Sequence, residues 1–179
     1  MADYFTQLVV QQDIPGNLIA PHEKLLLEQI LDANEQDGAI SYCSSEGPGA
    51  YIWLNRDAVK RALAAPAAPK VRSRLRKPLL QRYHAAPSDK AEFEFDLTAT
   101  AYGSDVYLII LQDIVRRARD ALPYITIAAS FTCNKMRKDG FGGMALILTP
   151  ARILFQSTND YLEKFIGRSE KKHRAAPPP

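Results

Sequence analysis

Cysteine and histidine are scarce in this chain of 179 residues, which contains two cysteines and three histidines. Two cysteines are too few for a disulfide scaffold, and we expect Cys43 and Cys133 to be small buried hydrophobic residues. The histidines, His22, His84 and His173, show neither the pairwise spacing of metal ligands nor a nearby cysteine pair. These shortages predict a protein that holds no metal ion.

Long apolar runs and the sequence signatures of catalysis are also missing. No apolar run approaches the roughly 20 residues that a membrane-spanning helix needs, and residues 1–5 lack the positive start of a signal peptide. We therefore expect a cytoplasmic protein with no membrane partner. The phosphate-binding loop, the dinucleotide fingerprint and the nucleophile elbow do not occur. Their absence favours a non-enzymatic protein without a cofactor.

The composition is that of an ordinary globular protein, with 46% hydrophobic and 24% charged residues. The net charge of +3 is unevenly distributed. Residues 70–82 contain six cations and no acid, and residues 168–174 contain four cations and one acid. The remainder of the chain is therefore acidic, and this segregation concerns partners and electrostatics rather than fold.

Two stretches, residues 4–65 and 91–167, each show the pattern strand, helix, strand, strand, helix. The two cysteines fall at matching places in the second strand of each stretch. We therefore predict an α+β fold of two βαββα units with mixed or antiparallel sheets, and we interpret the repeat as an internal duplication.

The predicted elements follow hydrophobic periodicity and end signals. In the first half they are a strand at 4–11, a helix at 21–34, a hairpin of 39–44 with 50–54, and a helix that Asn55 caps. In the second half they are a strand at 92–98, a helix at 104–122, a hairpin of 125–133 with 144–148, a helical turn opened by Thr149 and Pro150, and a helix at 159–166 that Gly167 ends.

The domain organisation follows from shifts in composition. Residues 1–65 form the first unit and residues 89–167 the second. Residues 66–88, where alanine and proline precede the basic run, are expected to form a flexible exposed linker with one helical turn near 75–83. Residues 168–179 are expected to be a disordered basic and proline-rich tail.

The best candidate for a site is the long second-half hairpin loop at 134–143, which concentrates cations and glycines. Glycine lets backbone N–H groups approach an anion closely, and loops carry function more often than the elements they join. The residues expected to bind a protein or an anion are Lys135, Arg137, Lys138, Gly140, Phe141, Gly142 and Gly143. The alternative is a solvated hairpin tip without a ligand.

The basic run within the predicted linker has several interpretations. Its cations could contact nucleic-acid phosphates together with the basic tail, and they are Lys70, Arg72, Arg74, Arg76, Lys77 and Arg82. Only Tyr83 could stack on a base, so sequence-specific recognition is poorly supported. The segment could instead bind an acidic partner, dock on the acidic body of its own chain, or serve as a plain linker.

Three classes of function follow. We predict a non-enzymatic protein-binding, adaptor or regulatory module whose partner is a protein, with a homodimer among the assemblies that open strand edges allow. The first alternative is a nucleic-acid-associated protein that uses residues 70–84 and the tail. The second is a small thiol-dependent enzyme centred on Cys133, whose pKa a cation such as Lys135 on the same strand face would have to lower.

Overall fold

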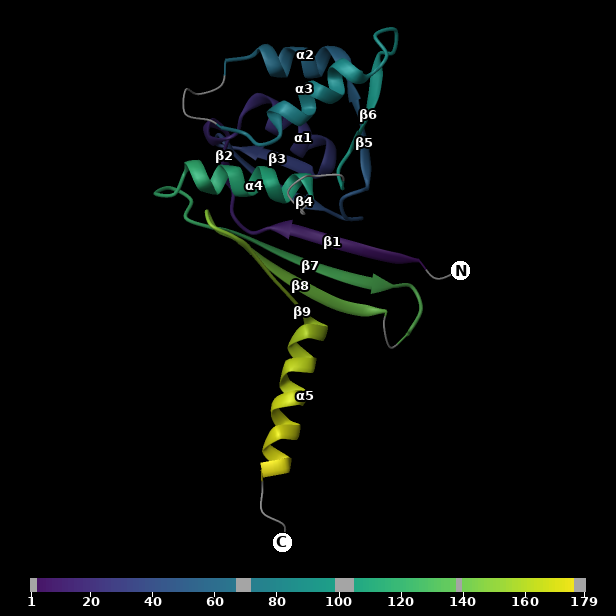
Figure 1. Cartoon of the computed structure of the whole chain (residues 1–179), viewed down its shortest axis with the longest axis vertical. Helices are drawn as coiled ribbons and strands as arrows, with labels where there is room; N and C mark the ends of the chain where they lie inside the picture. Colours follow the sequence, from purple (N-terminus) through teal and green to yellow (C-terminus); the bar gives the residue numbers. More distant parts are fainter. Residues whose placement is uncertain (1–2, 67–71, 99–104, 138–139, 176–179) are drawn as a thin grey trace.

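The computed structural model describes residues 3–66, 72–98, 105–137 and 140–175 (Figure 1). Within them the chain forms nine strands and five α helices, and every strand pair is antiparallel. The predicted α+β class is confirmed.

The main sheet takes strands from both halves of the chain. Its strand order is β2-β4-β1-β7-β8-β9, and β3 pairs with β4 to make seven strands. The bounds are β1 Tyr4–Val10, β2 Ile14–Pro15, β3 Asp32–Gln36, β4 Ala39–Ser44, β7 Ile125–Cys133, β8 Phe141–Leu148 and β9 Ile153–Ser157. Because β1 lies between β4 and β7, the first strand of the chain joins the two halves.

A second, two-stranded sheet pairs β5 (Tyr51–Asn55) with β6 (Glu92–Asp96). The predicted first-half hairpin is therefore wrong, because β4 and β5 lie in different sheets. β5 and β6 both alternate strictly between buried and exposed residues, and their pairing gathers Ile52, Leu54, Phe93 and Phe95 on one buried face. The internal duplication stays a prediction. β7, which carries Cys133, pairs with the strand that follows it, β8, whereas β4, which carries Cys43, does not pair with β5.

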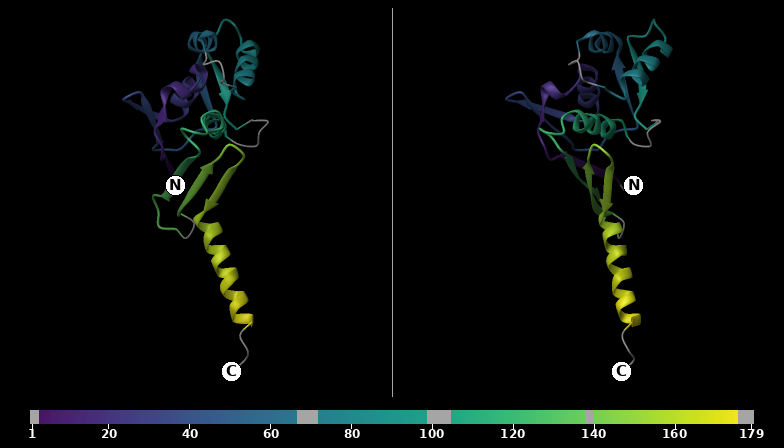
Figure 2. Two further views of the ribbon diagram at one scale, coloured as in Figure 1. Left: turned by 90° about the vertical axis from the view of Figure 1, so that its left-hand side faces the viewer. Right: turned by 60° about the vertical axis from the view of Figure 1, so that its left-hand side comes forward.

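The helices are α1 (Pro21–Ile30), α2 (Arg56–Ala64), α3 (Arg76–Ala85), α4 (Val106–Arg117) and α5 (Thr158–Ala175), and a 3-10 turn spans Gly16–Leu18. α4 lies between the strands β1, β7, β8 and β9 on one side and the helices α1, α2 and α3 on the other (Figures 1 and 2), and all of its residues from Val106 to Val115 are buried. The side chain of Asn55 accepts a hydrogen bond from the backbone N–H of Ala58 at 3.1 Å, as expected of a helix N-cap.

Three predicted helix ends were wrong, and one of them is that of α4, which ends at Arg117 rather than at 122. α1 ends at Ile30, because the chain turns at once into β3, which pairs with β4. α5 continues through Gly167 to Ala175, so the described part of the predicted tail is helical. Gly167 does not adopt the positive φ that a glycine helix cap requires, and an isolated glycine weakens a helix by only about 1 kcal/mol.

Residues 72–88 of the predicted linker are packed rather than exposed. Leu75 and Leu79 are buried in the core, and α3 lies against α2 and β6. The guanidinium of Arg56 donates to the backbone carbonyls of Tyr83 and Ala86 at 2.8 to 3.2 Å. The structure therefore places this part of the chain against the body, whereas the flexibility of the linker stays a prediction.

Candidate protein-binding surface

The four neighbouring strands β1, β7, β8 and β9 present one buried face and one exposed face. Six residues of the buried face pack beneath α4 and its neighbours: Leu8, Val10, Ile125, Ile127, Leu146 and Leu148. The residues that alternate with them lie side by side in the strand register and are exposed or half-buried. We call this set the outer sheet face: Phe5, Gln7, Val9, Thr126, Ala128, Ser130, Thr132, Phe141, Gly143, Ala145, Ile147, Leu154 and Gln156.

The outer sheet face carries no charged residue, and neither does any other position of these four strands. Its larger apolar side chains, Phe5, Val9, Phe141, Ile147 and Leu154, are between 40% and 47% exposed. An antiparallel sheet that faces water on one side ordinarily alternates apolar and polar residues. A contiguous uncharged face of this extent is typical of a binding surface.

Large and small residues are arranged in rows across this face. Phe5 and Val9 lie on β1, and Leu154 lies on β9. Between them, at the centre of β7 and β8, are the small residues Ala128, Ser130, Gly143 and Ala145, with Ala128 directly opposite Ala145. The small side chains therefore lie at the centre of the face, with larger apolar side chains around them: Phe5 and Val9 on β1, Phe141 and Ile147 towards the two ends of β8, and Leu154 on β9.

The predicted loop is shorter than expected and lies at one end of this face. Phe141, Gly142 and Gly143 belong to β8, because strand pairing with β7 begins at Phe141 opposite Thr132. A Cβ atom at Gly142 would overlap the ring of Phe131 on the neighbouring strand, so any other residue there would require this ring to move. Aromatic side chains commonly cover glycines in this way.

The remaining loop residues have different positions. Lys135 and Arg137 are exposed in the β7–β8 connection, whereas Gly140 is buried and a Cβ atom there would lie 3.0 Å from that of Cys133. Lys138 lies outside the described residues. The backbone N–H of Asn134 donates to the carbonyl of Asp3 at 3.1 Å, so the connection is tied to the start of β1. The structure thus places two of the predicted cations at the rim of the outer sheet face.

Sequence analysis missed β9, whereas the start of α5 at Thr158 lies one residue from the start of the helix predicted at 159–166. The predicted helical turn at Thr149 is instead a tight turn, in which the hydroxyl of Thr149 donates to the carbonyl of Arg152 at 2.9 Å. α5 begins directly after β9, where Ser157 and Asp160 exchange hydrogen bonds of 2.9 and 3.1 Å between side chain and backbone. A uniformly apolar stretch, 144–148 followed by 153–155, was the available signal for this second hairpin.

A shallow groove of about 410 Å³ lies at the junction of β8, β9 and α5. Its lining combines three residues of the outer sheet face, three that alternate with them along the strands, and two of α5: Gly143, Ala145 and Gln156; Ala129, Met144 and Ser157; Thr158 and Tyr161. The hydroxyl of Thr158 accepts from the backbone N–H of Gly143 at 3.2 Å, which fixes the first turn of α5 against β8. The groove extends the binding surface beyond the flat sheet.

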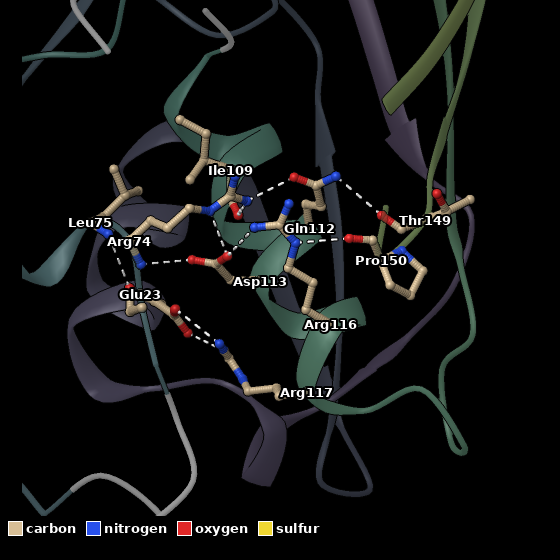
Figure 3. A network of polar contacts seen from close by, with 11 residues as sticks. Glu23, Arg74, Leu75, Ile109, Gln112, Asp113, Arg116, Arg117, Thr149 and Pro150 are labelled. Carbon is tan, nitrogen blue, oxygen red and sulfur yellow. Dashed lines mark hydrogen bonds and ion pairs between the residues drawn. The ribbon is translucent and has the colours of Figure 1, made fainter. Parts of the chain in front are cut away.

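Arg74, one of the predicted nucleic-acid residues, is engaged by side chains of its own chain (Figure 3). Arg74 forms an ion pair with Asp113 at 2.7 Å and donates to Gln112 at 2.9 Å, both on α4. Asp113 is only 3% exposed and also accepts from the backbone N–H of Arg74 at 2.8 Å. Docking on the body of the same chain, one of the alternatives for the basic run, is what the structure shows for Arg74.

The other cations of the run divide into two groups. Arg76 donates to the carbonyl of Leu63 at 3.1 Å, and Arg82 donates to that of Glu94 at 2.8 Å. Arg72 and Lys77 are exposed, and Lys70 lies outside the described residues. The described part of the run therefore presents fewer cations for phosphate contacts than its sequence suggests.

A second buried ion pair joins α1 to α4. Glu23, which is fully buried, pairs with the guanidinium of Arg117 (Figure 3), and Arg117 also donates to the carbonyl of Leu18 at 2.8 Å. The neighbouring His22 is buried, and burial together with the charges of Arg76 and Arg117 lowers its pKa to about 4. These pairs hold the helices in place and lie away from the outer sheet face.

The two cysteines occupy different positions on either side of β1. Cys43 lies opposite Val9 and is exposed, which corrects the expectation that both are buried, and Cys133 lies opposite Tyr4 and is buried. Lys135 does not share a strand face with Cys133, because β7 ends at Cys133. The arrangement that would activate this thiol is therefore not formed by Lys135.

Comparisons with protein-family models, curated proteins and solved structures found no match for this chain. Among the described residues, no helix has the length and apolar character that crossing a bilayer requires. The same part of the chain contains no cluster of three or more metal-ligating side chains.

Proposed function

We propose that the protein is a protein-binding module and that the outer sheet face is its docking surface. The observation that carries this proposal is the uncharged exposed face of four strands, in a chain whose other surfaces carry many charges. A partner that covers this face removes none of its charges from water, because it has none. It does remove apolar side chains from water, which favours binding by about 25 cal/mol for each Å² of apolar surface buried.

The arrangement around the face supports the same function. Protein interfaces combine an apolar centre with a polar rim, and Lys135 and Arg137 lie at one end of this face. The shape of the face favours one kind of ligand. Its flanking rows on β1 and β9 are three strand spacings apart, about 14 Å, and an α helix is about 10 Å wide. The small central residues, with larger apolar ones around them, therefore suit an amphipathic helix that packs on the centre of the face.

A paired substitution on β9 tests the proposal. Leu154 belongs to the outer sheet face, whereas the adjacent Phe155 points to the opposite side of the strand and is 58% exposed. We expect Leu154→Lys to weaken a partner complex at least tenfold, because it places a charge within the apolar centre. Phe155→Lys adds the same charge on the same strand and should leave the complex intact.

The measurement is quantitative mass spectrometry of proteins captured from nuclease-treated native lysate by the wild type and both variants. The melting temperatures of the variants should agree, because both positions are exposed. Equal recovery of every captured protein by wild type and Leu154→Lys would contradict the proposal. The double variant Lys135→Ala/Arg137→Ala should change the salt dependence of capture more than its extent, because rim charges act mainly on association rates.

A further inference from the structure

α5 is an amphipathic helix whose apolar side is largely uncovered by the residues that the structure describes. Tyr161, Leu162, Phe165 and Ile166 recur at the spacing that places them on one side of a helix, and each is between 55% and 58% exposed. We call these four residues the α5 stripe. Figures 1 and 2 show α5 projecting from the end of β9 away from the rest of the molecule, and its main contacts are with β8 and β9 at its base.

Two features at its base prevent α5 from turning back onto the outer sheet face of its own chain. No linker separates it from β9, which ends at Ser157. The reciprocal hydrogen bonds of Ser157 and Asp160, together with the bond between Thr158 and Gly143, fix the direction of the first turn. Folding back would require these bonds to break, so the described structure leaves the α5 stripe open to a second molecule.

We infer that the α5 stripe of one copy lies along the outer sheet face of a second copy, and that the exchange is reciprocal. This inference rests on the proposed function, because it names the helix that the outer sheet face binds. Each copy has one uncovered apolar helix and one uncharged face that suits a helix. A two-fold arrangement satisfies both faces and both helices at once and closes the assembly as a dimer.

The area involved matches what a stable dimer needs. Nine apolar side chains of the outer sheet face and the α5 stripe are between 40% and 58% exposed. At about 90 Å² of exposed surface each, they offer about 800 Å² per copy. Specific and stable interfaces bury about 800 Å² on each partner.

The first experiment measures mass in solution by sedimentation equilibrium over a range of concentrations of the full chain. The wild type should be a dimer, and Phe165→Glu should weaken dimerisation at least tenfold, because it places a charge in the α5 stripe. Gly167→Glu is the matched control, since a side chain at Gly167 meets no atom within 4 Å and points away from the stripe. A wild type that is monomeric both at about 100 μM and after 50-fold dilution from that concentration would overturn the inference.

The second experiment identifies the contacting surfaces. Two chains carry different tags and the substitution Cys43→Ser, which removes the exposed native thiol; one also carries Ala145→Cys and the other Phe165→Cys. A short bismaleimide should join the two tags in a mixture, because the inference places residue 165 of one copy over residue 145 of the other. Absence of this product in a sample that sediments as a dimer would contradict the arrangement.

The two proposals fail in distinguishable ways. If the wild type is a monomer and Leu154→Lys no longer captures a protein that the wild type captures, the proposed function of the outer sheet face stands. Only the second copy is then refuted as the ligand of this face. A dimer that neither Leu154→Lys nor Phe165→Glu weakens would refute the inference, and unchanged capture by Leu154→Lys would then refute the proposed function as well.

Discussion

Replacing Arg74 with methionine should destabilise the protein by about 3 kcal/mol. The substitution removes the guanidinium that lies 2.7 Å from Asp113 but keeps an apolar stem of similar length. The carboxylate is 3% exposed, and it would retain the backbone N–H of Arg74 at 2.8 Å and Arg116 at 3.7 Å. Removing one partner of a buried ion pair costs about 3–5 kcal/mol, and the remaining contacts place the loss at the lower end of this range.

Urea unfolding at equilibrium measures this loss. With an m-value of about 2 kcal/mol/M for a domain of this size, the midpoint should fall by about 1.5 M. The control is Arg72→Met, which removes the same charge two residues away at an exposed position and should change stability by less than about 0.5 kcal/mol. Equal midpoints for the two variants would refute the view that residues 72–88 are fixed to the body through Arg74.

Three further predictions concern single positions. Because burial lowers the pKa of His22 from 6.5 to about 4, the unfolded chain binds a proton that the folded chain does not bind between these pH values. The free energy of unfolding should therefore fall by about 3 kcal/mol from pH 6.5 to pH 4, and His22→Gln should remove that part of the slope in urea titrations. Gly142→Ala should lower the melting temperature through a clash with Phe131 worth about 1–3 kcal/mol, whereas Gly167→Ala should raise it slightly. Asn55→Ala should cost about 1 kcal/mol, measured by urea unfolding, and no loss would contradict its role as a helix cap.

Local sequence patterns were sufficient to predict those elements whose buried and exposed sides follow a regular alternation of residues. The alternation of residues 92–96 correctly placed Phe93 and Phe95 on the buried side of β6. The pairing of that strand was not predictable, because its partner β5 lies about 40 residues earlier and ends without a turn signal that points to it. Pairing between distant strands depends on the packing of the whole core.

In the candidate site, too, some residues could be predicted from the sequence and others could not. Lys135 and Arg137 were recognisable as an exposed charged connection, because loops reveal themselves through glycine and charge. The outer sheet face was not recognisable, since a strand such as β8 with apolar residues on both sides looks fully buried. Only the position of the covering helices decides which of its two sides meets solvent. Arg74 likewise looked like any cation of a basic run until the fold placed Asp113 beside it.

The place of β1 between β4 and β7 has a consequence for the nascent chain. Tyr4 at the start of the protein pairs with Cys133, so the two halves of the sheet cannot join until the ribosome has released β7. Until then one side of β1 is an unpaired strand edge without any charged residue, which is the kind of edge that recruits other chains. Synthesis that stops before residue 125 should therefore yield an aggregating fragment, and β1 needs protection until β7 has been synthesised.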